Sequence, residues 1–166
     1  MSNWEDIVAR VEAGERLSAD DALTLWQQAP LWRLGELAVK KKRSISGDKV
    51  FYNKNFHLEP TNTCVFNCKF CSFRRPKGSP EAWDMSMEEV EQMVHSYEGK
   101  GVTEVHIVGG VHPEHGIDYY CDMIRRVKAI LPDVAVKAFT AIELAYMIRK
   151  AGLTTEQGLK MLIEAG

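Results

Sequence analysis

The spacing of apolar residues changes once along the chain, from helical spacing to alternating strands and helices. Near the N-terminus, apolar residues recur at helical spacing after Ser18, a natural N-cap, and stop at Pro30. A second apolar series of helical spacing runs from Leu31 to Ala38. We therefore predict a helical extension over residues 1–48, which closes with a short linker from Ser44 to Asp48.

Strands and helices alternate from residue 49 onward. The stretch from Asn55 to Pro60 alternates apolar and polar residues as a half-buried strand does. Two further strands are predicted from Thr103 to Val108 and from Val134 to Thr140. The predicted helices begin at the capping box of Ser86 and then cover 119–131, 142–150 and 155–164. Short connections in this order predict an α/β fold with parallel strands and right-handed crossovers.

Composition and charge narrow the classes of function. The chain has 166 residues, of which 45% are hydrophobic and 27% charged, as expected for a globular protein with a sizeable core. The net charge is -2 and the basic run from Lys40 to Arg43 is short, which disfavours nucleic acid or an acidic membrane as partner. We find no signal-peptide pattern and no apolar stretch long enough to cross a bilayer, so we expect a cytoplasmic protein.

The cysteines give the strongest chemical signal. Cys64, Cys68 and Cys71 are separated by three and then two residues, directly after the first predicted strand. In a reducing compartment such thiols are poor candidates for disulfides. Thiolates are soft ligands that suit an iron–sulfur cluster or zinc. Cys121 lies among apolar helix positions, and we predict a small buried side chain there, outside the site.

The number of ligands favours iron–sulfur over zinc. A structural zinc site needs four ligands, and the nearby candidates for a fourth, His57 and His95, fall at no familiar zinc-finger spacing. Three ligands leave one metal position open for chemistry. A zinc-binding interaction module remains the alternative from another class of function.

The segment from Cys64 to Cys71, with aromatic Phe70 before the last cysteine, resembles the signature of the radical S-adenosylmethionine (SAM) superfamily. This resemblance implies a [4Fe–4S] cluster on Cys64, Cys68 and Cys71, with the amino and carboxylate groups of SAM on the fourth iron. It also implies an electron donor such as flavodoxin or ferredoxin. Phe70 is expected either beside the adenine of SAM or packed under the loop.

The superfamily resemblance implies a (β/α) TIM-type barrel, of which residues 49–166 would form the first three β/α units. Val108, Gly109 and Gly110 follow the second strand, where the family has a glycine-rich segment close to the methionine amino group of SAM. We therefore take these three as candidate cofactor-binding residues. Glycine permits a close approach of backbone and ligand, although a Gly-Gly pair is also common in plain turns.

In such a barrel, strand residues face the helices and the lumen alternately. The apolar set predicted to face the helices is Phe56, Leu58, Val105, Ile107, Val134, Val136 and Ala138. The opposite set, predicted to face the lumen, is His57, Glu59, His106, Val108, Lys137 and Phe139. Buried ionisable groups need partners or a ligand, so this set predicts either a polar substrate pocket or a structural network such as Glu59 with Lys137.

Three lumen residues are candidates for catalysis. Lys137 could neutralise a substrate carboxylate, and His57 or Glu59 could position the substrate or move a proton. His112 and His115 follow the glycine pair, and we expect them either in a solvated loop or at the substrate.

Four longer segments look like aminofutalosine synthase, the radical enzyme of the futalosine route to menaquinone; they are residues 55–62, 71–76, 106–113 and 137–143. The N-terminal stretch from Gly14 to Ser18 resembles the wider group. The resemblance implies a transferase that adds the 5′-deoxyadenosyl radical to the enol-ether double bond of 3-[(1-carboxyvinyl)oxy]benzoate. Rearrangement and loss of carbon dioxide then give aminofutalosine. Cyclic dehypoxanthinylfutalosine synthase and deazaflavin synthase share the cysteine spacing and remain alternatives.

The family's barrel continues beyond three β/α units, whereas this sequence reaches Gly166 at the end of a predicted helix. The resemblance therefore implies an N-terminal part of the enzyme, cut before the fourth strand. The third strand would then have a free edge, which favours association with another chain.

Overall fold

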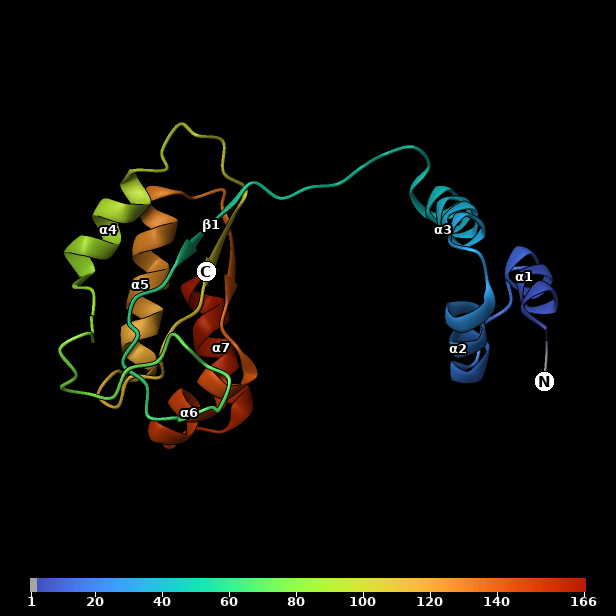
Figure 1. Cartoon of the computed structure of the whole chain (residues 1–166). Coiled ribbons are helices and arrows are strands. Elements are labelled where there is room, and N and C mark those ends of the chain that lie inside the picture. The colour runs from blue at the N-terminus through green and yellow to red at the C-terminus, as the bar shows by residue number, and fades with distance from the viewer. Residues whose placement is uncertain (1–2) are drawn as a thin grey trace. The chain divides into compact units, whose positions relative to one another are not determined.

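A computed structural model describes residues 3–166, and the chain divides into two compact units, Met1–Tyr52 and Asn53–Gly166 (Figure 1). The sequence alone placed this boundary after Asp48. No helix within the described residues is both long enough and apolar enough to span a membrane.

The N-terminal unit consists of the helices α1 (Trp4–Glu12), α2 (Ala19–Gln28) and α3 (Leu31–Ser46). Ser18 is the N-cap of α2, as predicted, because its hydroxyl accepts a hydrogen bond from the Asp21 N–H at 3.1 Å. In return the Asp21 carboxylate accepts from the Ser18 N–H at 2.9 Å. These bonds to Ser18, together with Arg10, lower the pKa of Asp21.

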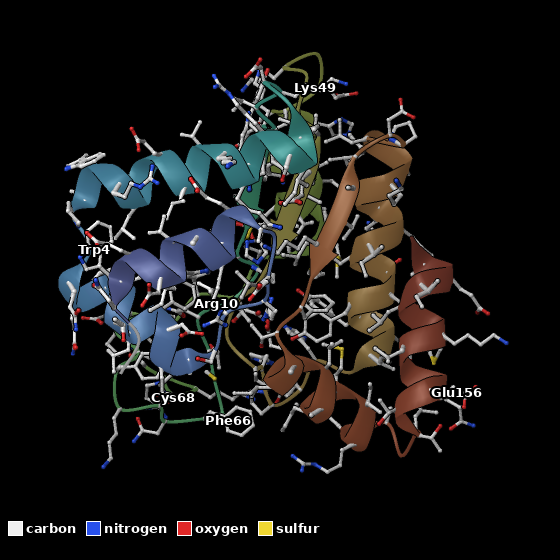
Figure 2. All side chains as sticks on the ribbon, turned by 90° about the vertical axis from the view of Figure 1, so that its right-hand side faces the viewer. Trp4, Arg10, Lys49, Phe66, Cys68 and Glu156 are labelled. Carbon is white, nitrogen blue, oxygen red and sulfur yellow. The ribbon has the colours of Figure 1, made fainter. Side chains whose placement is uncertain are left out.

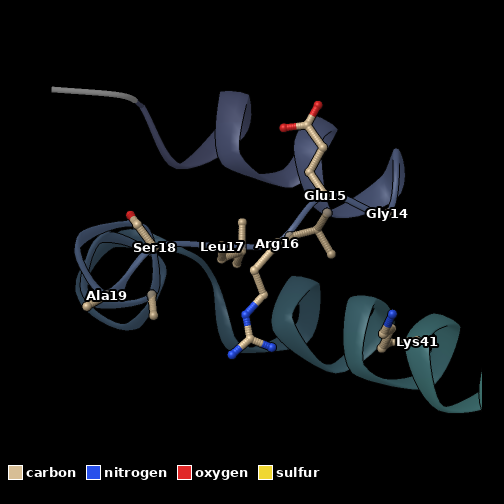
Figure 3. A pocket seen from close by; sticks show the side chains of 9 residues that line it. Gly14, Glu15, Arg16, Leu17, Ser18, Ala19 and Lys41 are labelled. Carbon is tan, nitrogen blue, oxygen red and sulfur yellow. The ribbon is translucent and has the colours of Figure 1, made fainter.

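The third helix of this unit is longer than the sequence predicted. Helix α3 continues through Ser46 and ends at Gly47, whose φ of 59° is a left-handed conformation that favours glycine. The predicted linker from Ser44 to Asp48 is therefore partly wrong, because Ser44 to Ser46 are helical. Figure 3 shows a groove of this unit, which is lined by Arg16, Ser18 and Lys41 among others.

The C-terminal unit carries a three-stranded parallel sheet in the order β1-β2-β3, with helices between and after the strands. Its elements are β1 (Asn55–Leu58), α4 (Met87–His95), β2 (Glu104–Ile107), α5 (Ile117–Ile130), β3 (Ala135–Ala138), α6 (Ala141–Lys150) and α7 (Thr155–Ala165). The predicted element order is confirmed, although each strand is shorter than the sequence suggested. Within the described residues, β3 pairs with β2 alone.

One face of the sheet is buried under helices and forms the core. The side chains of Leu58, Val105 and Ile107 are completely buried, and α5 contributes further apolar side chains that include Cys121 at 1% exposure. Val136 and Ala138 are partly buried on the same side. The predicted helix-facing set is therefore confirmed, and so is the burial of Cys121, whose pKa is raised by that burial.

Candidate functional site

The segment that follows β1 forms the base of the cysteine loop, which we define as residues 64–75. On one side, the Gly110 N–H donates to the Thr61 carbonyl at 2.7 Å, so this segment lies beside the end of β2. On the other side, the Cys64 N–H donates to the Arg75 carbonyl at 3.0 Å. The Arg75 N–H donates to the Asn62 carbonyl at 2.8 Å. These bonds close the cysteine loop at its base and hold that base beside the segment that follows β2.

Buried polar side chains hold this base in place. Asn62 is 1% exposed; its amide donates to the Glu81 carbonyl at 3.0 Å and its side-chain oxygen accepts from the Trp83 N–H at 2.8 Å. The Thr61 hydroxyl donates to the Trp83 carbonyl at 2.9 Å. Satisfied buried networks of this kind fix a single arrangement. The sequence showed Thr61 and Asn62 only as part of a family-like segment, and their anchoring role was missed.

The three thiols of the loop are free and accessible. Cys64 is partly exposed, Cys68 and Cys71 are exposed, and the Cys71 N–H donates to the Cys68 carbonyl at 3.1 Å in a tight turn. The other two candidate ligands lie elsewhere, since His57 is on β1 and His95 bonds Glu98 at 2.7 Å. The loop thus offers three soft thiolate donors from one anchored segment, which fits a cluster with three protein ligands.

Two aromatic residues of the loop, Phe66 and Phe70, differ in what their rings contact. Phe70 is 94% exposed, so the expectation that it packs under the loop is wrong; the loop is exposed throughout residues 67–71. Phe66 instead contacts α6, with its ring centroid 6.0 Å from that of Tyr146. Figure 2 labels Phe66 and Cys68 on this loop. An exposed ring at Phe70 remains available to a ligand.

The glycine pair after β2 is required by the close approach of two backbones. A Cβ atom on Gly110 would lie 2.3 Å from the Thr63 carbonyl oxygen, and one on Gly109 would lie 2.8 Å from the Thr61 carbonyl oxygen. Contacts this short are not tolerated between non-bonded atoms. The structure therefore explains both glycines by packing against the base of the cysteine loop, and their predicted contact with SAM stays a prediction.

A buried carboxylate that the sequence analysis did not single out fixes this glycine segment. Glu143 is 5% exposed, and its two oxygens accept hydrogen bonds from the Gly109 N–H at 3.1 Å and the Thr140 N–H at 2.7 Å. In return the Thr140 hydroxyl accepts a hydrogen bond from the Glu143 N–H and caps α6. The Thr-x-x-Glu spacing is a capping-box signal that the sequence did contain. Its second role, on Gly109, depends on tertiary structure.

The polar residues of the sheet form a row, as predicted. Strand register pairs His57 with His106 and His106 with Lys137, so the three lie side by side on the face opposite the core. The rings of His57 and His106 are 4.9 Å apart, and His57 Nδ1 is 3.9 Å from Glu59 Oε1. Within residues 3–166 Lys137 makes no ion pair, so the structural pairing of Glu59 with Lys137 is not formed.

Phe139 does not belong to this row. The sequence placed it in the lumen, but its ring lies 4.9 Å from Tyr120 of α5 and packs against the core. Strand β3 ends at Ala138, so the alternation of faces does not extend to residue 139. Val108 and Glu59 likewise lie just beyond their strands, and both are partly exposed.

His112 and His115 form a cluster with Asp84, and the expectation of a solvated loop is wrong for both. Their side chains are 7% and 16% exposed, and His115 Nε2 lies 2.9 Å from an Asp84 carboxylate oxygen. Burial and the neighbouring His115 lower the pKa of His112. Asp84 was not singled out, because only the fold brings it next to these rings.

The model of the radical SAM superfamily matches residues 58–166, which include the cysteine loop, the glycine pair, and His106 and Lys137 of the polar row. The chain belongs to the radical SAM superfamily.

Curated relatives match over nearly the whole of this chain. Aminodeoxyfutalosine synthase of Streptomyces coelicolor is 38% identical over 97% of this chain and 42% of its own length. The enzyme of the same name from Thermus thermophilus is 37% identical over 96% of this chain and 43% of its own length. FO synthase of Mycobacterium tuberculosis is 34% identical over 97% of this chain and 20% of its own length. This radical SAM chain therefore spans less than half the length of these relatives.

Solved structures support the fold. Methylornithine synthase PylB matches with a TM-score of 0.64 and 17% identity, over 96% of this chain and 56% of that one. The hydrogenase maturase HydG from Carboxydothermus hydrogenoformans matches with a TM-score of 0.59 and 20% identity, over 98% of this chain and 46% of that one. Radical SAM proteins use a [4Fe–4S] cluster and SAM. The three free thiols of the cysteine loop fit such a cluster.

Proposed function

We propose that this chain carries out the reaction of aminodeoxyfutalosine synthase, a step of menaquinone biosynthesis. The observation that carries the proposal is the 37–38% identity to two such enzymes over almost the whole chain. The polar row gives a physical reason, because the substrate of this reaction, 3-[(1-carboxyvinyl)oxy]benzoate, bears two carboxylates. The proposed electron donor is of the flavodoxin or ferredoxin class.

In the proposed site, Cys64, Cys68 and Cys71 hold three irons of the cluster, and the fourth iron is left for SAM. The bound cluster and SAM would supply a 5′-deoxyadenosyl radical, which is added to the enol-ether double bond of the substrate with loss of carbon dioxide. Because the Gly109 N–H already donates to Glu143, the segment from Val108 to Gly110 would receive the amino group of SAM through carbonyl oxygens.

The chain's own residues would bind and orient the substrate. Lys137 is exposed on the polar face and has the charge to bind a substrate carboxylate. His57 lies in the same row and close to Glu59, so this pair could hold or move a proton at the substrate. The exposed ring of Phe70 would cover the adenine of SAM.

The proposal is tested with the reconstituted protein and with a chimera. In the chimera, residues 1–166 replace the matching 42% of the Streptomyces coelicolor enzyme. Each protein is incubated with reductant, SAM carrying an isotopic label in its adenosyl group, and 3-[(1-carboxyvinyl)oxy]benzoate. We expect the label in aminofutalosine from the chimera. A chimera that loads its cluster and cleaves SAM but leaves this substrate unchanged contradicts the proposal.

The same assay tests a second function within the superfamily. FO synthases are 34% identical to this chain, and the deazaflavin reaction is therefore the main competitor. Recovery of the adenosyl label only as free 5′-deoxyadenosine would favour an enzyme that abstracts hydrogen from its substrate. Recovery of the label in the product supports the addition reaction proposed above.

A further inference from the structure

Three potential metal ligands converge at a place to which the proposed reaction assigns no role. Asp84 lies just before α4, and His112 and His115 lie in the connection from β2 to α5. One ligand atom from each lies within 4.8 Å of the other two. The group contains none of the three cysteines of the loop, so it is a separate cluster of donors.

The distances between these donors suit one small cation. His115 Nε2 lies 2.9 Å from Asp84 Oδ1 and 3.0 Å from Asp84 Oδ2. His112 Nε2 lies 3.9 Å from Asp84 Oδ2. Nitrogen and oxygen ligands bind zinc at about 2.0–2.2 Å, so two ligands of one ion lie about 3–4 Å apart. A single ion can therefore reach all three groups with small movements of the side chains.

The surrounding structure holds the donors in position. The backbone of Asp84 forms a bridge with Thr61 at the base of the cysteine loop. The ring of His115 is stacked between those of His112 and Tyr119, at centroid distances of 4.1 and 3.7 Å. His112 is buried and Tyr119 is partly buried, whereas the Asp84 side chain is 37% exposed, so an ion could enter from the Asp84 side.

The charge of the cluster also favours a cation. Within residues 3–166, the ion-pair partners of Asp84 are the two imidazoles, and no lysine or arginine neutralises it. The nearby Lys77 pairs with Glu114 instead. With both imidazoles neutral, the cluster carries one negative charge, which a divalent ion would compensate.

We infer that Asp84, His112 and His115 form a second metal site, which takes a divalent first-row transition ion and lies apart from the cysteine loop. Two imidazoles and one carboxylate are a ligand set used for such ions, with the remaining positions open to water. Two hydrogen bonds oppose binding: the Glu114 N–H donates to His112 Nδ1 at 3.2 Å, and His115 Nε2 bonds the Asp84 carboxylate at 2.9 Å. Coordination through the two Nε2 atoms gives up both bonds, so the affinity is lower than that of a four-ligand site.

An ion in this site would join two parts of the chain that flank the cofactor region. It would tie the connection after Gly110 to the segment before α4, and both pack against the base of the cysteine loop. The expected consequence is a more stable loop base in the presence of the ion. This inference does not depend on the proposed reaction.

The test uses the full chain with Cys64, Cys68 and Cys71 replaced by serine, so that the loop cannot bind the probe. The metal-free protein is titrated with Co²⁺ alone, followed by its visible absorption, and with Zn²⁺ alone, followed by calorimetry. We expect one ion per chain, with an absorption spectrum typical of nitrogen and oxygen ligands. Asp84→Asn and His115→Gln should each weaken binding by at least about tenfold, since the first replaces the anionic ligand with a neutral amide and the second removes an imidazole.

The matched control is His95→Gln. His95 also pairs with a carboxylate, that of Glu98 at 2.7 Å, but it has no third donor nearby in the described part of the chain, so its loss should leave binding unchanged. Circular dichroism of each variant without metal shows whether it is folded, and the spectrum of the parent protein identifies the ligands even if a variant unfolds. Absence of binding in the parent, or equal affinity in Asp84→Asn, would overturn the inference.

Discussion

Replacement of Gly110 by alanine tests the close packing at the centre of the site. The added Cβ atom would lie 2.3 Å from the Thr63 carbonyl oxygen and 2.9 Å from the Asn62 carbonyl carbon. Both neighbours are backbone atoms, so no side-chain rotation relieves the contact. To restore an ordinary van der Waals distance, the base of the cysteine loop must move by about 1 Å.

This movement lowers the free energy of unfolding of the C-terminal unit by an amount that can be estimated. Overpacking in a close-packed region costs about 1–3 kcal/mol, and here it also strains the Gly110 N–H bond to Thr61 at 2.7 Å. Urea unfolding of the C-terminal unit, followed by circular dichroism, should therefore show a lower midpoint for Gly110→Ala. Anaerobic reconstitution should also load less cluster, because the displaced base carries Cys64.

Gly116→Ala is the matched control from the same connection. Gly116 has a negative φ of -98°, and a Cβ atom there meets nothing within 4 Å. Its replacement by alanine should change the free energy of unfolding by no more than about 0.5 kcal/mol in either direction. A small increase would come from the restricted unfolded chain. If Gly110→Ala has the same unfolding midpoint and cluster content as Gly116→Ala, the packing explanation of the glycine pair is wrong.

Three further predictions concern other parts of the molecule. Cys68→Ser should prevent loading of the [4Fe–4S] cluster, whereas Cys121→Ser should load normally because that thiol lies in the core; iron and sulfide content checks both. Lys137→Met in the chimera should lower substrate turnover more than cluster content, since it removes a charge from the polar row, and unchanged turnover would make Lys137 structural. Because the pKa of Asp21 is lowered in the folded state, its contribution to the stability of the N-terminal unit is present at neutral pH. That contribution is lost as the pH falls from the unfolded pKa of about 4 through the folded pKa. The protection of the α2 amides, measured as exchange relative to the intrinsic rate at each pH, should fall more between about pH 6 and about pH 3 in the parent than in Asp21→Asn, and an equal fall would contradict the assignment.

Much of the fold follows from local patterns in the sequence. Alternation along three short strands was enough to assign His57, His106 and Lys137 to one face, and the register of the sheet confirms it. Capping residues located the start of α2, and likewise the start of α4 at Ser86. Such signals involve only a few neighbouring residues, so they can be recognised without knowledge of tertiary contacts.

The rest of the site depends on contacts between distant residues. Glu143 bonds Gly109 from 34 residues away, and Asp84 meets His115 from 31 residues away. No local spacing in the sequence indicates that the residues of either pair are in contact. Phe139 was misplaced for a related reason, since the strand ends one residue before it and the ring turns to α5. Sequence patterns therefore located the chemistry of the thiols, and the fold was needed to find what holds them.

The central claim is that the cysteine loop carries a cluster with one iron left open for SAM. The most direct measurement is the electron paramagnetic resonance spectrum of the anaerobically reconstituted and reduced protein, recorded before and after addition of SAM. We predict the signal of a reduced [4Fe–4S] cluster whose g-values change when SAM is added. A cluster signal that SAM leaves unchanged, or a colourless protein that holds zinc on the same thiols, would contradict the account.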